Sequence, residues 1–279
     1  MRDHTRAERA VGFLLGLIDE ETAERVRARI GHPGPEHPEA ARRLLRQTWT
    51  WAGDLPSSVL LWMLQEDDPN LNALVWRLLP SESGLGRAIA RGVPFGPGRT
   101  EAVAVDRTLW AEEPEPPENY VRHGLVGALR TATAMAPARA AASMVVTRAD
   151  WLTVADADRE HPLPGYARWA LAVRPDCPPT VRAQFGAHPK FTHRVRQAGV
   201  LEGPAEYASE YGPAAYVLQV LTLGHVLFPA RVHEAADCLR ALVHDHLGGR
   251  EEAWAVLAQL VETFHGNVPE LVVTAGAIA

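Results

Sequence analysis

The 279-residue sequence predicts an all-α protein built from short helices that are stacked on one another. Apolar residues recur at the three-to-four-residue spacing of amphipathic helices through most of the chain. Proline and glycine divide these segments into short pieces, and no segment shows the sustained alternation that is typical of a strand. Because helices this short are costly to nucleate and bury little surface alone, we expect them to be stabilised by their neighbours.

Residues 1–92 are expected to form an N-terminal group of helices. In this group Asp19 is a suitable N-cap, Gly31 is a stop, and Asp68 with Pro69 is a typical helix start. A first expected helix has its apolar face at residues 10–17 and a second, which follows Asp19, has its apolar face at residues 23–30. Further helices are expected at residues 38–51, 54–63 and 69–79.

The stretch 93–118 has a different composition. It opens with Val-Pro-Phe-Gly-Pro-Gly at residues 93–98, and residues 112–118 are acidic and rich in proline, which does not favour a helix. We interpret it as a long central loop that connects two halves, with a short strand or helix near residues 103–110. A ligand-binding loop is the alternative.

Residues 119–279 are expected to form a C-terminal group of helices, several of which begin at proline. The expected helices cover residues 120–135, 138–146, 149–157, 164–173, 178–186, 189–198, 230–247 and 251–264, and the apolar run 217–223 is expected to be buried. The N-terminal helices, the stretch 93–118 and the C-terminal helices are expected to form one continuous domain.

A repeat signal links two of these segments. Pro69-Asn-Leu-Asn-Ala-Leu-Val75 aligns with Pro179-Thr-Val-Arg-Ala-Gln-Phe185, with proline at the helix start and apolar residues at the positions that face inward. Residues 54–92 and 163–200 resemble the short helical units of leucine-rich-repeat-variant and HEAT-like proteins. The resemblance implies an armadillo/HEAT-like α-solenoid, an architecture that commonly serves as a protein-binding scaffold.

Some leucine-rich-repeat-variant proteins carry an iron–sulphur cluster on cysteines, but this chain has only two cysteines, Cys177 and Cys238. The resemblance therefore implies no redox cofactor. Two cysteines fit a reducing compartment, the N-terminus does not resemble a signal peptide, and the apolar runs are too short to span a membrane. We expect a cytoplasmic protein that has no membrane segment.

No motif predicts an enzyme. His-Glu-x-x-His, Gly-x-Ser-x-Gly and a phosphate-binding loop are all absent from the sequence. His244 and His246 would diverge on a helix, and His225 and His233 flank a turn and can converge, but without an evident third ligand. We expect no catalytic residue, no cofactor and no metal.

The most distinctive candidate surface is basic. Between Cys177 and Leu201 there is no Asp or Glu, although the chain has a net charge of −6. The candidate partner-binding residues of this stretch are Arg182, His188, Lys190, His193, Arg194 and Arg196. Trp76 with Arg77 is a second candidate, since tryptophan and arginine often anchor interfaces.

These observations predict a non-catalytic scaffold that binds a protein or peptide, an acidic one if the basic stretch is used. Three alternatives remain. The basic stretch can be an ordinary solvated helix face. The chain can be an enzyme or a small-ligand or metal-binding module without a recognisable motif. Residues 182–196 can also hold a nucleic-acid backbone, although the net charge argues against a general nucleic-acid binder.

Overall fold

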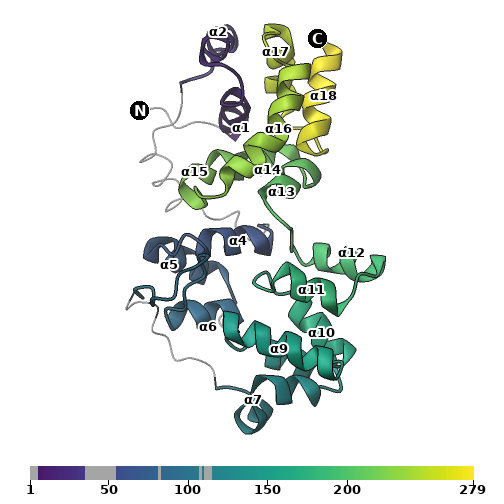
Figure 1. Cartoon of the computed structure of the whole chain (residues 1–279). Helices are drawn as coiled ribbons and strands as arrows, with labels where there is room; N and C mark the ends of the chain where they lie inside the picture. The colour runs from purple at the N-terminus through teal and green to yellow at the C-terminus, as the bar shows by residue number, and fades with distance from the viewer. Residues whose placement is uncertain (1–5, 35–54, 81–82, 107–108, 110–114) are drawn as a thin grey trace. The chain divides into compact units, whose positions relative to one another are not determined.

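The computed structural model describes residues 6–34, 55–80, 83–106, 109 and 115–279. Within these ranges the regular elements are helices and no residue lies in a β-strand, which confirms the all-α prediction (Figure 1). The helix expected at 38–51 and the end of the element expected at 103–110 lie outside the described residues. In the described ranges, no helix has both the length and the apolar character needed to cross a bilayer.

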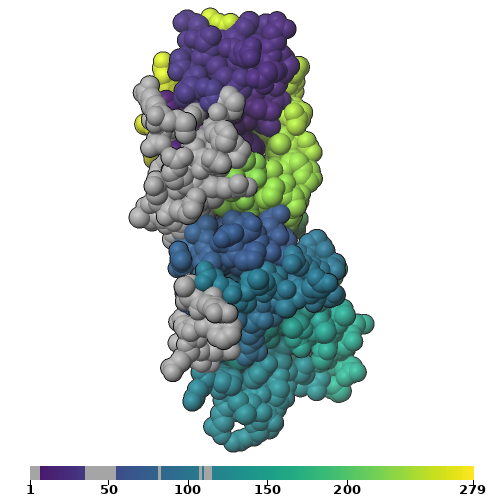
Figure 2. All heavy atoms as spheres, turned by 90° about the vertical axis from the view of Figure 1, so that its left-hand side faces the viewer, coloured from purple at the N-terminus to yellow at the C-terminus, as the bar shows by residue number. Residues whose placement is uncertain are grey.

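The chain divides into two compact units. One unit is drawn from residues 1–50 and 203–279, and the other from residues 51–202. The stretch 93–118 therefore lies inside the second unit, and the units divide the chain elsewhere. The reason is long-range packing that periodicity does not reveal, since the N-terminal helices pack on helices near the C-terminus. Figure 2 shows the purple atoms of the N-terminal helices directly beside the yellow-green atoms of the C-terminal segment.

The first unit has these helices: α1 (Arg6–Leu15), α2 (Glu20–Ile30), α13 (Pro204–Glu210), α14 (Ala214–Thr222), α15 (Gly224–Leu227), α16 (Val232–His246), α17 (Glu251–Leu260) and α18 (Val268–Ile278). Helix α1 packs on α14, α2 on α17, and α18 on both α16 and α17. As predicted, Asp19 caps α2 by accepting the Thr22 amide at 2.9 Å, and Gly31 ends it with φ 68°. Trp254 and Tyr207 are among the largest side chains of its core.

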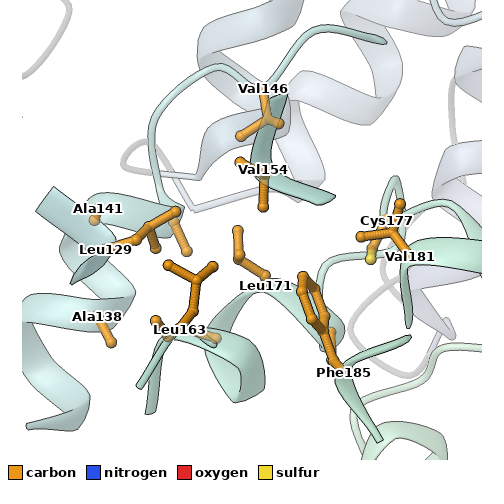
Figure 3. Close-up of a cluster of buried hydrophobic side chains, with 14 of the residues drawn as sticks. Leu129, Ala138, Ala141, Val146, Val154, Leu163, Leu171, Cys177, Val181 and Phe185 are labelled. Atoms are coloured by element: carbon orange, nitrogen blue, oxygen red, sulfur yellow. The ribbon is translucent and has the colours of Figure 1, made fainter. Parts of the chain in front are cut away.

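The second unit has these helices: α4 (Ser57–Leu64), α5 (Pro69–Leu78), α6 (Gly84–Ala90), α7 (Glu118–Arg130), α8 (Met135–Ala142), α9 (Arg148–Glu160), α10 (Gly165–Ala172), α11 (Pro179–Phe185) and α12 (Pro189–Gln197). From α7 to α11, each helix packs on helices one or two places along the chain. Helix α7 contacts α8 and α9, α8 contacts α10, and α11 contacts α9 and α10. Figure 3 shows their apolar side chains, among them Leu129, Val154, Leu171 and Phe185, pointing toward one another in a shared core.

Residues 93–98 form a loop, as the sequence predicted, and the loop is anchored within this second unit. The Asp67 carboxylate accepts the amide of Phe95 at 2.8 Å and that of Gly96 at 3.0 Å. The Arg148 guanidinium donates to the carbonyls of the same two residues. A Cβ on Gly96 would lie 2.5 Å from Asp67 Oδ2, so only glycine fits here without a shift.

A buried carboxylate joins three helices of the second unit. The Asp158 side chain of α9 is 1% exposed and forms a bidentate ion pair with Arg168 of α10, at 2.8 and 3.0 Å. It also accepts the Leu163 amide at 2.8 Å and the Gln184 side chain of α11 at 3.0 Å. Burial alone would raise the pKa of Asp158, but the hydrogen bonds from Arg168, Leu163 and Gln184 outweigh it and lower the pKa.

Candidate binding surface

Helix α12 is held at both of its ends. Pro189 occupies the first turn, and the N-cap His188 accepts the Lys190 amide through Nδ1 at 3.2 Å, which requires the ring hydrogen to sit on Nε2. Beyond the C-terminal end, Gly199 adopts φ 73° and its carbonyl accepts the Ser58 amide of α4 at 3.0 Å. The N-cap therefore begins the helix locally, and the C-terminal contact attaches it to α4.

The inner side of α12 packs on aromatic and apolar residues. Val195 is buried in the core of the unit, and Phe191 packs on the edge of that core. The Phe191 ring meets the Trp169 ring of α10 edge-on, with centroids 5.7 Å apart and planes at 80°. This side fixes the rotation of the helix and thereby which residues face outward.

The outer side of α12 is basic. Five of the predicted residues are exposed there, and we call them the α12 basic face: His188, Lys190, His193, Arg194 and Arg196. The guanidinium carbon of Arg194 lies 6.0 Å from the centroid of Trp169, a cation–π arrangement at the border between the basic and aromatic residues. The sequence identified the charges but not Trp169, because only packing brings α10 beside α12.

The dipole of α12 makes the positive charges at its two ends differ in their effect on the stability of the helix. Arg194 and Arg196 lie in the last turn, where a positive charge is favourable for the helix itself. Lys190 lies in the first turn, which has no acidic residue and where a positive charge is unfavourable. Local helix stability therefore explains the two arginines in part, but it does not explain Lys190.

Arg182 does not belong to this face. Its guanidinium is partly buried and donates to three carbonyls that follow or end α10: Ala172 at 3.0 Å, Arg174 at 3.2 Å and Cys177 at 2.9 Å. Burial lowers the pKa of Arg182. The residue thus connects α11 to α10, and we leave it out of the candidate surface.

Trp76 and Arg77 lie on α5, which Figure 1 shows on the opposite side of this unit from α12. Trp76 is half-buried and Arg77 is exposed. The structure does not bring this pair together with the α12 basic face, so the two predicted sites are separate surfaces.

In the described part of the chain, the two cysteines and the histidines do not form a recognisable catalytic arrangement. Cys177 is buried in the second unit, and burial raises the pKa of its thiol to about 12, which makes it a poor nucleophile. Cys238 is an exposed free thiol on α16. Among the described residues, no group of three or more His, Cys, Asp or Glu side chains is arranged to hold a metal ion.

Comparisons of the chain with protein-family models, with curated proteins and with solved structures found no match.

Proposed function

We propose that this chain is a non-catalytic helical scaffold that binds an acidic, partly apolar segment of a protein through the α12 basic face. The observation that carries the proposal is the combination on one exposed helix of five basic or imidazole side chains, a sequence environment without Asp or Glu, and an adjoining Trp169–Phe191 pair. Cations that face solvent attract carboxylates, and aromatic rings at their border supply an apolar contact.

As part of this proposal, helices α7–α12 form a stacked array of the α-solenoid type. Helices α7–α11 pack on those one or two places along the chain, and Phe191 of α12 packs on Trp169 of α10. This is the contact pattern of a stacked helical array. In such an array an edge helix leaves one side uncovered. Helix α12 is the last helix of its unit along the chain, and its basic side is exposed.

An acidic peptide suits this surface better than a nucleic-acid backbone. Without Arg182, the face carries three Lys or Arg residues on a nine-residue helix. A duplex backbone is usually gripped by more cations than this, and the chain as a whole has a net charge of −6. A short acidic segment needs only a few pairings and gains apolar contact from Trp169.

The test is fluorescence anisotropy with a labelled peptide of about 12 residues, rich in Asp and Glu around a Leu-Phe pair. We expect the wild-type chain to bind it with a Kd of about 10–100 µM at low salt, and added salt to weaken the binding. The double variant Lys190→Glu/Arg194→Glu should bind at least about tenfold more weakly, since it replaces attraction with repulsion.

The matched control is Arg25→Glu/Arg29→Glu, which changes two exposed arginines on α2. Each exchange lowers the net charge by 2, so both double variants go from −6 to −10. If the control weakens binding as much as the α12 variant, the attraction is non-specific and the proposal fails. Tighter binding of a labelled DNA duplex, with the same dependence on Lys190 and Arg194, would instead favour the nucleic-acid alternative.

A further inference from the structure

An acidic segment of this chain has the composition that the α12 basic face is proposed to bind. Residues 110–118 read Trp-Ala-Glu-Glu-Pro-Glu-Pro-Pro-Glu, with four glutamates and one tryptophan. From Thr108 to Val121 the sequence contains no Lys, Arg or His. The segment is therefore the acidic, partly apolar counterpart of the stretch from Cys177 to Leu201, which contains no Asp or Glu.

The structure describes the last four residues of this segment, 115–118, and they lie at or near the surface. Glu115 and Glu118 are exposed. Pro117 has φ −57° and ψ 140°, which is close to the extended conformation of a polyproline helix. Glu118 forms a surface ion pair with Arg122 one turn further along α7. Exposed pairs of this kind contribute little to stability, so Glu118 can exchange Arg122 for another cation at small cost.

The spacing of the charges suits a contact between this segment and α12. In a polyproline helix, residues three apart lie on the same side and about 9 Å from each other. Glu115 and Glu118 have this spacing in the sequence. On α12, Lys190 and Arg194 are exposed, lie on one side and are separated by about 6 Å along the helix axis. The long side chains of lysine and arginine can span the difference.

Within one copy of the chain, the described end of the segment and the α12 basic face lie far apart in the second unit. Glu118 begins α7, and Glu115 lies within about 10 Å of it, since a chain spans at most about 3.5 Å per residue. Helix α7 packs on α8 and α9, whereas Phe191 of α12 packs on Trp169 of α10. Figure 1 shows α7 and α12 on different sides of this unit. The glutamates are therefore placed to meet α12 of another copy.

We infer that the acidic segment 110–118 of a second copy of this chain occupies the α12 basic face. This inference rests on the proposed function and names its partner. The contact is heterologous, because it joins different surfaces of the two copies, so each added copy offers a site for the next one. The chain should therefore form oligomers that grow with concentration and come apart in salt.

Sedimentation velocity at low ionic strength measures this association directly. We expect the average sedimentation coefficient of the wild-type chain to rise between about 10 and 500 µM, as for contacts with a Kd of about 100 µM. Added salt of about 0.5 M should return it to the value of the monomer, because the attraction between exposed charges is screened.

Two variants, each of which removes one side of the contact, locate it. Lys190→Glu/Arg194→Glu reverses the charge of the α12 basic face, and Glu112→Gln/Glu113→Gln/Glu115→Gln removes three of the four charges of the segment. Each variant alone should sediment as a monomer. A 1:1 mixture should form heterodimers, because the first variant keeps the acidic segment and the second keeps the basic face.

The matched control is Glu20→Gln/Glu21→Gln/Glu24→Gln, which removes three exposed glutamates of α2. Both triple variants change the net charge from −6 to −3. The control should associate as the wild-type chain does. If it becomes monomeric like the variant of the segment, the association depends on total charge and the inference fails.

The inference is overturned if the wild-type chain remains monomeric at about 500 µM, or if the mixture of the two variants does not associate. It is also overturned if a monomeric wild-type chain binds the acidic probe peptide more weakly than the segment variant does, since the segment would then occupy the face of its own copy. The same peptide distinguishes the two failures. If the peptide binds at α12 and the chain stays monomeric, the inference alone fails; if neither the peptide nor a second copy binds, the proposed function fails as well.

Discussion

Replacing Asp158 with asparagine should destabilise the helices α9–α11 by about 2–4 kcal/mol, since it leaves buried donors without their charged acceptor. The amide NH₂ of asparagine would face donors of Arg168 and Gln184 at one of the two oxygen positions, where the carboxylate now accepts both. Hydrogen exchange of peptides from α9–α11 should become about a hundredfold faster, because tenfold corresponds to about 1.4 kcal/mol.

The control lies two residues away on the same helix. Asp156 is exposed and forms a surface ion pair with Arg159, so Asp156→Asn should change stability by less than about 0.5 kcal/mol. Equal effects of the two substitutions would show that the buried network does not hold these helices together.

The pH dependence of the Asp158 variant follows from the direction of its pKa shift. The pKa of Asp158 is lower in the folded chain than the ordinary value of 3.8, so its carboxylate contributes fully above that value and the contribution is lost as the pH falls through the lower, folded-state pKa. We therefore expect a constant stability difference between wild type and Asp158→Asn above about pH 5 and a shrinking one below about pH 4.

Replacing Trp254 with alanine should destabilise the first unit by about 3–5 kcal/mol. Trp254 is 0% exposed, and α17, which carries it, packs on α1, α2 and α18. Its indole Nε1 also donates to the Gly248 carbonyl at 2.9 Å. The alanine variant loses the packing and leaves a large cavity. Urea unfolding followed by circular dichroism should show a lower midpoint.

The variant Trp254→Phe separates the contribution of packing from that of the indole hydrogen bond. It keeps most of the apolar contact and removes the indole donor, so we expect a loss of about 1–2 kcal/mol. A phenylalanine variant as unstable as the alanine variant would contradict the view that packing supplies most of the stabilisation at this position.

Local signals in the sequence predicted the helices better than their assembly. Asp19, Gly31 and Pro69 act within one turn of their own helix, and each marks a helix end in the structure. The sequence did not show that Asp67 and Arg148, far from Gly96 along the chain, hold the loop 93–98 in place. Such contacts have no periodicity that a sequence pattern could reveal.

The candidate site was likewise predicted in part. The stretch without Asp or Glu identified Lys190 and Arg194, because charge is visible in a sequence and exposure follows from the apolar spacing of α12. Arg182 has the same charge but donates to three backbone carbonyls, a role that depends on how α11 meets α10. Trp169 was not among the predicted site residues, although its ring borders the basic face.

The most direct test of the functional account is NMR mapping of the acidic peptide on the ¹⁵N-labelled chain. We expect chemical-shift changes to be confined to the amides of residues 188–198 and the Trp169 indole, and to disappear in Lys190→Glu/Arg194→Glu. Changes centred on α5 near Trp76, or spread over all exposed arginines, would contradict it.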